Sequence, residues 1–292
     1  MRIGLFAPLA NPIATPDFLQ TLASVAEECG FDSLWVAEHL VLFDEYASRY
    51  PYAANGRIPA GGESGILEPF TTLSFLAAVT KRIRLGTGIC LVPQRNPVYT
   101  AKEVANVDFL SGGRLDFGVG VGWLAEEFRA AATPFERRGA RCRSYLEVMK
   151  RLWCDEVSEY KDDFYELPAC RQYPKPIQKP HPPIHFGGES DAALRRVADL
   201  GQGWYGFNLE PEELLERLGR LDALLAERDR RRSEVQITVS PYMKGCDLDK
   251  LKRYRDAGAD RVILIGLARD REGLRPALEN LAESFVVPAE SL

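Results

Sequence analysis

Histidine is scarce in this chain, and the histidines that occur are poorly placed to bind a metal. Only three are found among 292 residues. His181 and His185 are four residues apart, but the two prolines between them prevent the helix that would align both rings on one face. The six cysteines form no C-x-x-C pair, which excludes a zinc knuckle and a thioredoxin-type redox motif. We therefore expect reduced, buried thiols and no metal site.

A strong net charge and a long apolar run are also missing. The chain has 37 lysines and arginines against 42 aspartates and glutamates, which gives a formal net charge of −5. This charge is too small to favour broad electrostatic binding to nucleic acid or to an anionic membrane surface. No apolar run approaches the ~18 residues that span a bilayer, and residues 1–8 have the pattern of a buried strand rather than of a signal peptide. We expect a cytoplasmic protein with no nucleic-acid partner and no membrane partner.

The motifs of unaided covalent chemistry are absent as well. The sequence has no G-x-S-x-G nucleophile elbow, no cysteine paired with a suitably placed histidine, and no Walker lysine. Few of its side chains could perform difficult chemistry alone. A bound cofactor is therefore the expected source of reactivity.

What the chain does contain is a regular alternation of strand-like and helix-like segments. Eight short runs of β-branched and apolar residues are each followed by a helical pattern. The expected strands are residues 2–9, 33–38, 84–92, 115–121, 183–187, 203–207, 236–242 and 261–266. The expected helices are residues 17–28, 70–81, 97–110, 138–153, 191–200, 211–230, 248–256 and 272–285. This alternation predicts an α/β fold, a (β/α)8 TIM barrel that occupies residues 1–292 as a single domain, with an open doubly wound sheet as the alternative.

Two long segments interrupt the alternation. Residues 40–67 form an extended loop after the second expected strand and are rich in glycine, proline and tyrosine. A loop of this length is commonly functional, and in a barrel it would lie on the catalytic face and close over the site. Residues 154–182, rich in proline and aromatic residues, form an insertion before the fifth expected strand. We expect a small hairpin and an extended arm there.

Glu38 and His39 stand at the end of the second expected strand, where a barrel places functional side chains. Strand alternation sends the two side chains to opposite sides. His39 can exchange a proton near neutral pH and is the candidate proton donor or acceptor, with a structural histidine as the alternative. Glu38 is the candidate for orienting His39 or for tuning its pKa.

Glycines at the ends of two further strands indicate a ligand that lies against the backbone. Gly86 and Gly88 would admit a planar ring, although small residues are also typical of a tightly packed inner barrel layer. The stretch from Gly120 to Ala125 fits the G-x-G-x-x-A dinucleotide fingerprint, but its late position in the chain disfavours that interpretation. The candidate cofactor-binding residues of these two strands are Thr87, Gly88, Ile89, Gly120, Val121, Gly122 and Trp123.

The segment before the expected helix 191–200 is a candidate phosphate site. Gly187, Gly188, Glu189 and Ser190 would expose backbone N–H groups at a helix N-terminus, an arrangement that suits an anion. A simple turn with a helix cap is the alternative. Together with the groove for a ring, this site favours a cofactor that has both a planar ring and a phosphate.

Several motifs together resemble the luciferase-like monooxygenase superfamily, and most closely its branch that uses the deazaflavin coenzyme F420. The resemblance follows the chain in order and covers nearly all of it, and the fold that it implies is a (β/α)8 barrel. The motifs are Trp35-Val36-Ala37-Glu38-His39, Leu67-Glu68-Pro69-Phe70, Arg84-Leu85-Gly86-Thr87-Gly88, residues 111–123, and Glu126-Glu127-Phe128.

The resemblance also implies a role for each strand end. The cofactor ring is expected against Gly88 and Ile89, which a non-prolyl cis peptide would join. The pair Glu38-His39 is expected near the reactive edge of the ring. The phosphate is expected on the backbone of residues 187–190, with residues 120–123 alongside. A homodimer is the assembly that the family suggests.

One departure from the family pattern bears on the choice of cofactor. Many relatives that use FMN carry an Arg-Gly pair after the fourth strand, whereas this chain has Val121-Gly122. The missing arginine favours F420 over FMN. The leading hypothesis is an oxidoreductase that transfers a hydride between coenzyme F420 and a small organic substrate. An FMNH2-dependent monooxygenase that uses O2 and a non-catalytic flavin-binding barrel are the alternatives.

Overall fold

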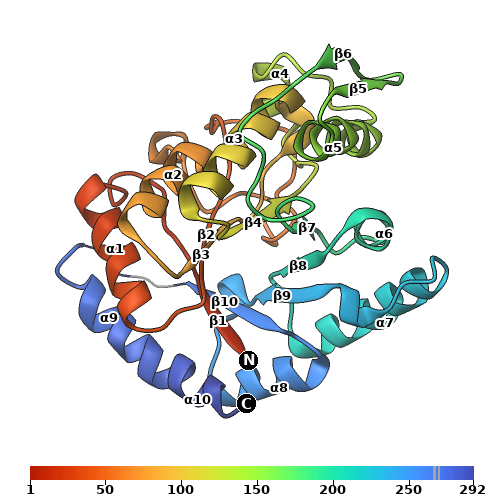
Figure 1. Cartoon of the computed structure of the whole chain (residues 1–292). Helices are drawn as coiled ribbons and strands as arrows, with labels where there is room; N and C mark the ends of the chain where they lie inside the picture. Colours follow the sequence, from red (N-terminus) through yellow and green to blue (C-terminus); the bar gives the residue numbers. More distant parts are fainter. Residues whose placement is uncertain (266–267, 269) are drawn as a thin grey trace.

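The computed structural model describes residues 1–265, 268 and 270–292. Within these residues, eight parallel strands close into a barrel in the order β1-β10-β9-β8-β7-β4-β3-β2 (Figure 1). The barrel strands are β1 (Arg2–Phe6), β2 (Ser33–Val36), β3 (Arg84–Thr87), β4 (Leu115–Val119), β7 (Ile184–Gly187), β8 (Gly203–Phe207), β9 (Gln236–Ser240) and β10 (Arg261–Ile265). The closed order confirms the predicted barrel and excludes the open doubly wound sheet.

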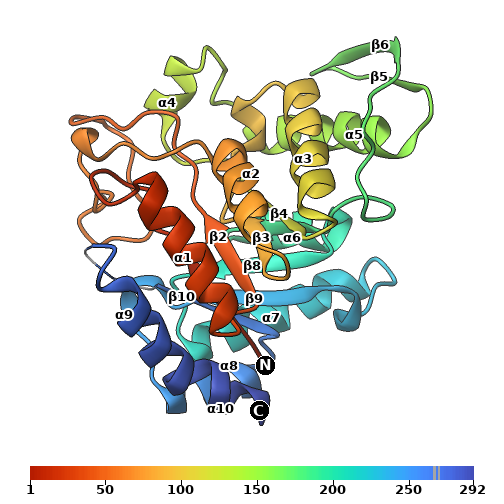
Figure 2. The same cartoon turned by 60° about the vertical axis from the view of Figure 1, so that its left-hand side comes forward.

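Helices surround the barrel and connect its strands (Figure 2). The long ones are α1 (Pro16–Glu28), α2 (Pro69–Val79), α3 (Pro97–Ser111), α5 (Arg138–Cys154), α6 (Asp191–Leu200), α7 (Pro211–Ala226), α8 (Leu248–Ala257) and α9 (Leu274–Leu281). The helix predicted over 272–285 is interrupted, because α9 gives way to a π-helical turn and then to α10 (Val287–Glu290). The short helix α4 (Ala125–Ala130) was not predicted. In the described part of the chain, no helix is both long enough and apolar enough to span a membrane.

Side-chain caps fix the beginnings of several helices, as their sequences predict. The Ser190 hydroxyl accepts a hydrogen bond from the backbone N–H of Ala193 at 3.2 Å, which begins α6. Asp247 does the same for Lys250 at 2.8 Å, which begins α8. Gly258 then ends α8 with φ of +105°, a left-handed conformation that glycine adopts at little cost.

Five barrel strands end earlier than their apolar composition predicts. The run over 84–92 leaves the sheet after Thr87, where a cis peptide joins Gly88 to Ile89. The runs over 2–9, 33–38, 115–121 and 236–242 likewise stop at residues 6, 36, 119 and 240. Residues such as Leu9, Leu91 and Val121 continue beyond the sheet to line a cavity, so their apolar character reflects burial rather than strand pairing. Gly266, the predicted end of the last strand, lies outside the described residues.

The insertion before β7 contains the hairpin that its sequence predicts. The strands β5 (Ser158–Lys161) and β6 (Glu166–Cys170) pair antiparallel and form a separate two-stranded sheet. Both views show this hairpin at the outer edge of the molecule, next to α5 (Figures 1 and 2). The hairpin therefore extends the fold without entering the barrel.

The barrel interior has a charged layer and an apolar layer. Asp116 accepts hydrogen bonds from the guanidinium groups of Arg84 and Arg261, and the buried ring of His185 lies beside it. Two positions further along the strands, Trp35, Tyr205 and Ile263 form a separate buried cluster. Because this second layer lies nearer to the C-terminal ends of the strands, it forms the floor of the region where a barrel binds its ligands.

Candidate active site

A cavity of about 540 Å3 opens at the C-terminal ends of the barrel strands. Its wall is formed by residues in the last positions of β1, β7 and β8, by residues that follow β1, β2, β3, β4 and β7, and by part of the loop over 40–67. Most of the lining side chains are apolar or aromatic. The polar groups that line it are few, which is typical of a site for a small organic ligand.

The cavity brings together most of the residues that the sequence marked as candidates. Thr87, Gly120 and Glu189 are the candidates that do not line it. The Thr87 hydroxyl donates to the Gly118 carbonyl at 2.7 Å within the barrel wall, and the absence of a side chain at Gly120 makes room for Ile89. The candidates that do line it are Glu38, His39, Gly88, Ile89, Val121, Gly122, Trp123, Gly187, Gly188 and Ser190.

The two glycines of β3 differ in what they accommodate. A Cβ on Gly86 would stand 2.6 Å from the indole ring of Trp35, so this glycine makes room for the inner barrel layer. Gly88 borders the cavity, and a Cβ there would meet only ordinary contacts. Packing therefore explains Gly86, whereas the position of Gly88 at the cavity is compatible with the ligand interpretation.

His39 is held by an acid that the sequence did not identify. Its Nδ1 lies 3.2 Å from Oε2 of Glu127, which is buried on α4, although the two residues are 88 positions apart. In the described part of the chain, Nε2 of His39 has no hydrogen-bond partner, and the ring lines the cavity. A ring fixed through Nδ1 leaves Nε2 to face a ligand.

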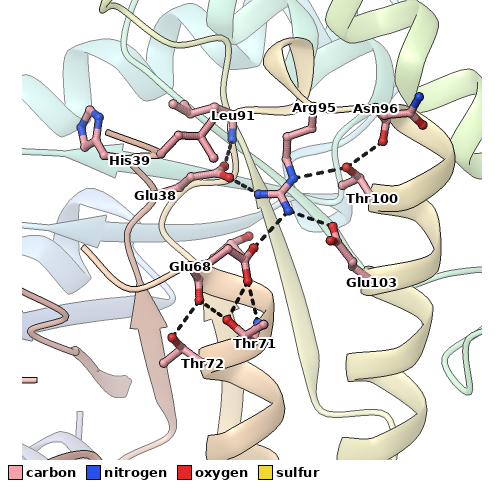
Figure 3. Close-up of polar contacts among 12 residues, drawn as sticks. Glu38, His39, Glu68, Thr71, Thr72, Leu91, Arg95, Asn96, Thr100 and Glu103 are labelled. Carbon is pink, nitrogen blue, oxygen red and sulfur yellow. Dashed lines mark hydrogen bonds and ion pairs between the residues drawn. The ribbon is translucent and has the colours of Figure 1, made fainter. Parts of the chain in front are cut away.

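The expectation that Glu38 orients His39 is wrong. One oxygen of Glu38 accepts from the backbone N–H of Leu91 at 2.5 Å, and the other pairs with the guanidinium group of Arg95. Figure 3 shows the side chain of Glu38 directed toward Arg95 and that of His39 directed away from it. The predicted alternation of the two side chains is correct, and it is the reason that they cannot form a pair.

Arg95 is the centre of a largely buried group of charges, which we call the Arg95 cluster: Arg95, Glu38, Glu68 and Glu103. Its guanidinium group donates to Glu68 at 3.0 Å and to Glu103 at 2.8 Å, in addition to Glu38 (Figure 3). Burial alone would lower the pKa of Arg95, but the surrounding acids raise it above its ordinary value. The cluster joins β2, α2 and α3 behind the cavity wall.

Several residues of the loop over 40–67 line the cavity, and carboxylates of other segments hold the loop in place. Glu127 accepts from the backbone N–H of Leu40 at 2.6 Å, and Glu126 accepts from that of Ala47 at 2.8 Å. Further along the loop, the Tyr52 hydroxyl donates to Glu189 at 3.0 Å. The loop therefore contributes part of the cavity wall, at the catalytic face where its position predicts it.

Glu189 serves the loop rather than facing the cavity. Besides the Tyr52 hydroxyl, its carboxylate accepts the backbone N–H of Phe207 at 2.8 Å. Burial raises the pKa of Glu189 to about 7. Its carboxylate thus links the loop to the end of β8.

The part of the cavity at the N-terminus of α6 is suited to an anion. Gly188 has φ of +100°, and the N-terminus of α6 with the Ser190 hydroxyl follows directly. Arg196, one helical turn beyond Ala193, lines the same cavity and forms no ion pair with any described residue. Arg138 donates to the Gly122 carbonyl at 3.0 Å, and it too forms no ion pair within the described ranges. Burial lowers the pKa values of both arginines, and neither guanidinium group has a carboxylate of the described residues within ion-pair distance.

The strand pattern does not identify Arg196 and Arg138, because both lie on helices and not directly after a strand. The spacing of Ser190, Ala193 and Arg196 offered a signal, since residues three apart in a helix share a face. Glu127 belongs to one of the motifs that resemble the family, but no spacing indicates its contact with His39, which depends on how the segment after β4 folds back.

Comparisons with known proteins agree with this geometry. A model of the luciferase-like monooxygenase family matches residues 1–243. An uncharacterised protein of Mycobacterium tuberculosis is 31% identical over 275 residues, which cover 90% of this chain and 92% of the relative. The FMNH2-dependent dimethylsulfone monooxygenase of Pseudomonas putida is 29% identical over 241 residues, 81% of this chain and 60% of that enzyme.

A solved structure extends the likeness to the whole fold. The coenzyme F420 dependent tetrahydromethanopterin reductase of Methanopyrus kandleri superposes with a TM-score of 0.77, at 16% identity and over 98% of both chains. An identity this low is evidence for the fold alone. The match of the family model over most of the chain and the full-length relative above 30% identity carry the assignment: this protein belongs to the luciferase-like monooxygenase family.

Proposed function

We propose that the protein is an oxidoreductase that transfers a hydride between coenzyme F420 and a small organic substrate. The observation that carries this proposal is the single cavity that joins an apolar floor, the ring of His39 and the anion-binding end at α6. A ligand with a planar ring and a phosphate would use all three at once.

The residues present fit such a cofactor. The side chains of Phe6, Ile89 and Tyr205 line the cavity over the apolar layer, and with Gly88 beside them they would support the ring. The Ser190 hydroxyl, the first N–H groups of α6 and the guanidinium group of Arg196 would hold the phosphate. When bound, the cofactor would supply the hydride chemistry that no side chain of the protein offers.

His39 would move the proton that accompanies hydride transfer. Glu127 fixes its Nδ1, so Nε2 would donate to or accept from the substrate. The loop over 40–67, closed by Glu127 and Glu189, would exclude water from the cavity. The aromatic residues Tyr50, Tyr52 and Phe207 in the wall favour an uncharged, apolar or ring-bearing substrate.

The choice between F420 and FMN rests on single residues. Val121 stands where many FMN-using relatives place a phosphate-binding arginine, which supports F420. Arg196 could take the place of that arginine from α6, and a relative is FMNH2-dependent. An FMNH2-dependent monooxygenase that uses O2 is therefore the second candidate.

Titration of the purified protein with F420 and with FMN, each oxidised and reduced, tests the proposal. We expect F420 to bind more tightly, as followed by the change in its absorbance spectrum, and its reduced form to be reoxidised only when an accepted substrate is present. Tight binding of FMN alone, with O2 consumption coupled to product formation, would overturn the proposal in favour of the second candidate. Binding of either cofactor without any substrate-dependent turnover would leave a non-catalytic binding barrel.

We further propose that two copies associate into a homodimer. The exposed side chains of α3 support this, because Tyr99, Phe109 and Leu110 are large, apolar and open to solvent. Light scattering should give twice the mass of one chain, and the double substitution of Phe109 and Leu110 by glutamate should reduce it to that of one chain.

A further inference from the structure

The floor of the cavity contains a hydroxyl group that points inward from β8. Side chains alternate along this strand, and Tyr205 belongs to the inner layer of the barrel. Its ring stacks on Trp35 with centroids 5.1 Å apart and on Phe207 with centroids 6.1 Å apart. Rings on both sides fix its orientation, so the hydroxyl cannot turn away toward solvent.

This hydroxyl makes no hydrogen bond of normal geometry with the described residues. Tyr205 is 2% exposed, and its Oη forms no hydrogen bond within the described ranges. Its neighbour Trp35 differs, because the indole N–H donates to the Ser33 hydroxyl at 3.0 Å. The adjacent Ser240 donates its own hydroxyl proton to the Ile263 carbonyl at 3.1 Å. Buried polar groups without partners are rare in folded proteins, and at the wall of a cavity such a group indicates a ligand.

The position of the hydroxyl relates it to the proposed ring site. Tyr205 lines the cavity, and its Oη lies 3.4 Å from the point where a Cβ on Gly88 would stand. It therefore faces the peptide against which the ring would lie. Burial raises the pKa of Tyr205 above its ordinary value, so the group keeps its proton and acts as a donor at neutral pH.

We propose that Tyr205 Oη donates a hydrogen bond to a carbonyl oxygen or ring nitrogen of the cofactor ring that is bound against Gly88 and Ile89. The proposal rests on the proposed function, in that it requires a flavin or deazaflavin in this cavity. Both classes of ring carry the pyrimidine carbonyl groups that would accept the bond. Tyr205 is thus a binding residue for either cofactor, and it does not discriminate between them.

The variant Tyr205→Phe tests the proposal, with Tyr254→Phe as its matched control. Tyr254 is also fully buried, but its hydroxyl donates to the Leu209 carbonyl, so its loss removes a hydrogen bond that the protein makes by itself. We expect Tyr205→Phe to raise the Kd of the bound cofactor roughly three- to tenfold and to shift its absorbance band. Without cofactor, its urea midpoint should equal or exceed that of the wild type, because the lost hydroxyl had no partner.

The control should behave in the opposite way. Tyr254→Phe should lower the urea midpoint and leave the Kd and the spectrum unchanged. An unchanged Kd and spectrum in Tyr205→Phe would overturn the proposal, and so would a lowered urea midpoint with no change in binding. A wild-type protein that binds neither F420 nor FMN would refute the proposed function, and the role of Tyr205 with it.

Discussion

Two groups of buried carboxylates flank the cavity, and they are neutralised in different ways. In the Arg95 cluster, Glu38 is paired with a guanidinium group and is 1% exposed. On the other side, Glu127 is equally buried but contacts the ring of His39 and backbone N–H groups of the loop over 40–67. The first group joins elements of the barrel to one another, whereas the second joins the barrel to a loop.

The difference indicates that the two groups of carboxylates have different roles. A guanidinium group that several carboxylates share fixes its neighbours in place, which suits a wall that must not move. Single hydrogen bonds to N–H groups and to a tyrosine hydroxyl are weaker, and they can open one by one. We expect the Arg95 cluster to determine stability and the acids beneath the loop to determine activity.

Arg95→Met should produce the largest change in stability. It leaves the carboxylate of Glu38 buried without its counter-charge, which typically costs about 3–5 kcal/mol in the free energy of unfolding. Urea denaturation, followed by tryptophan fluorescence, measures the loss. Arg253→Met is the matched control, because Arg253 pairs with Glu212 on the surface, where such pairs contribute little. If the two variants lost stability equally, the Arg95 cluster would not be the framework inferred above.

His39→Asn tests the other side of the cavity. Loss of a proton-transfer group should reduce turnover by roughly 10²- to 10⁴-fold, while the Kd of the cofactor changes little. Turnover is measured as the reoxidation of reduced cofactor by an accepted substrate. His181→Asn is the control, because His181 is buried beside Trp153 and does not line the cavity. Full activity in His39→Asn would remove this residue from the mechanism.

Glutamine variants of Glu127 and Glu38 sharpen the contrast between the two groups of carboxylates. Glu127→Gln should reduce turnover, because a neutral amide stabilises a protonated imidazole less than a carboxylate does. Glu38→Gln should mainly reduce stability. The reverse result would restore the sequence-based expectation that Glu38 acts through His39.

The sequence predicts the barrel and many of the residues that line its cavity, because both follow from local patterns. Apolar periodicity identifies the strands, and the motif around Glu38 and His39 places both residues at the cavity. Local patterns do not predict contacts between segments that are distant in the sequence, because Glu127 reaches His39 only through the turn after β4. Strand ends were overestimated because residues such as Leu91 are buried by the cavity and not by pairing. Periodicity reports burial, and it cannot tell a sheet from a pocket.

Glu189, which links the loop to β8, makes the stability of the protein sensitive to pH. Burial raises its pKa from an ordinary 4.5 to about 7, so between these values the folded protein binds a proton that the unfolded chain releases. The contribution of Glu189 to stability is therefore greatest below pH 4.5 and is lost as the pH rises through 7. The loss amounts to roughly 1–3 kcal/mol.

Glu189→Gln isolates this effect. We expect the variant to match the wild type near pH 5 and to be the more stable protein at pH 8, by urea denaturation at both values. The quantity to compare is the difference in the free energy of unfolding between the variant and the wild type. His185 is present in both proteins, and its effect on stability changes with pH in the opposite direction. Burial lowers the pKa of His185 to about 4, and its contribution grows as the pH rises toward 6.5. A difference that does not vary with pH would contradict the assignment.

Arg196→Gln should have the smallest effect. It tests the part of the cavity at α6 that is suited to an anion, rather than either group of acids. Arg196 forms no ion pair in the described part of the chain, so its removal should leave stability unchanged and raise the Kd of FMN and of F420 about tenfold. Riboflavin is FMN without its phosphate, and its Kd should not change. Arg195→Gln is the control, because the neighbouring Arg195 is exposed and does not line the cavity. An equal loss of affinity for riboflavin and FMN would show that Arg196 contacts the ring portion of the ligand, and the phosphate would then depend on the backbone of α6 alone.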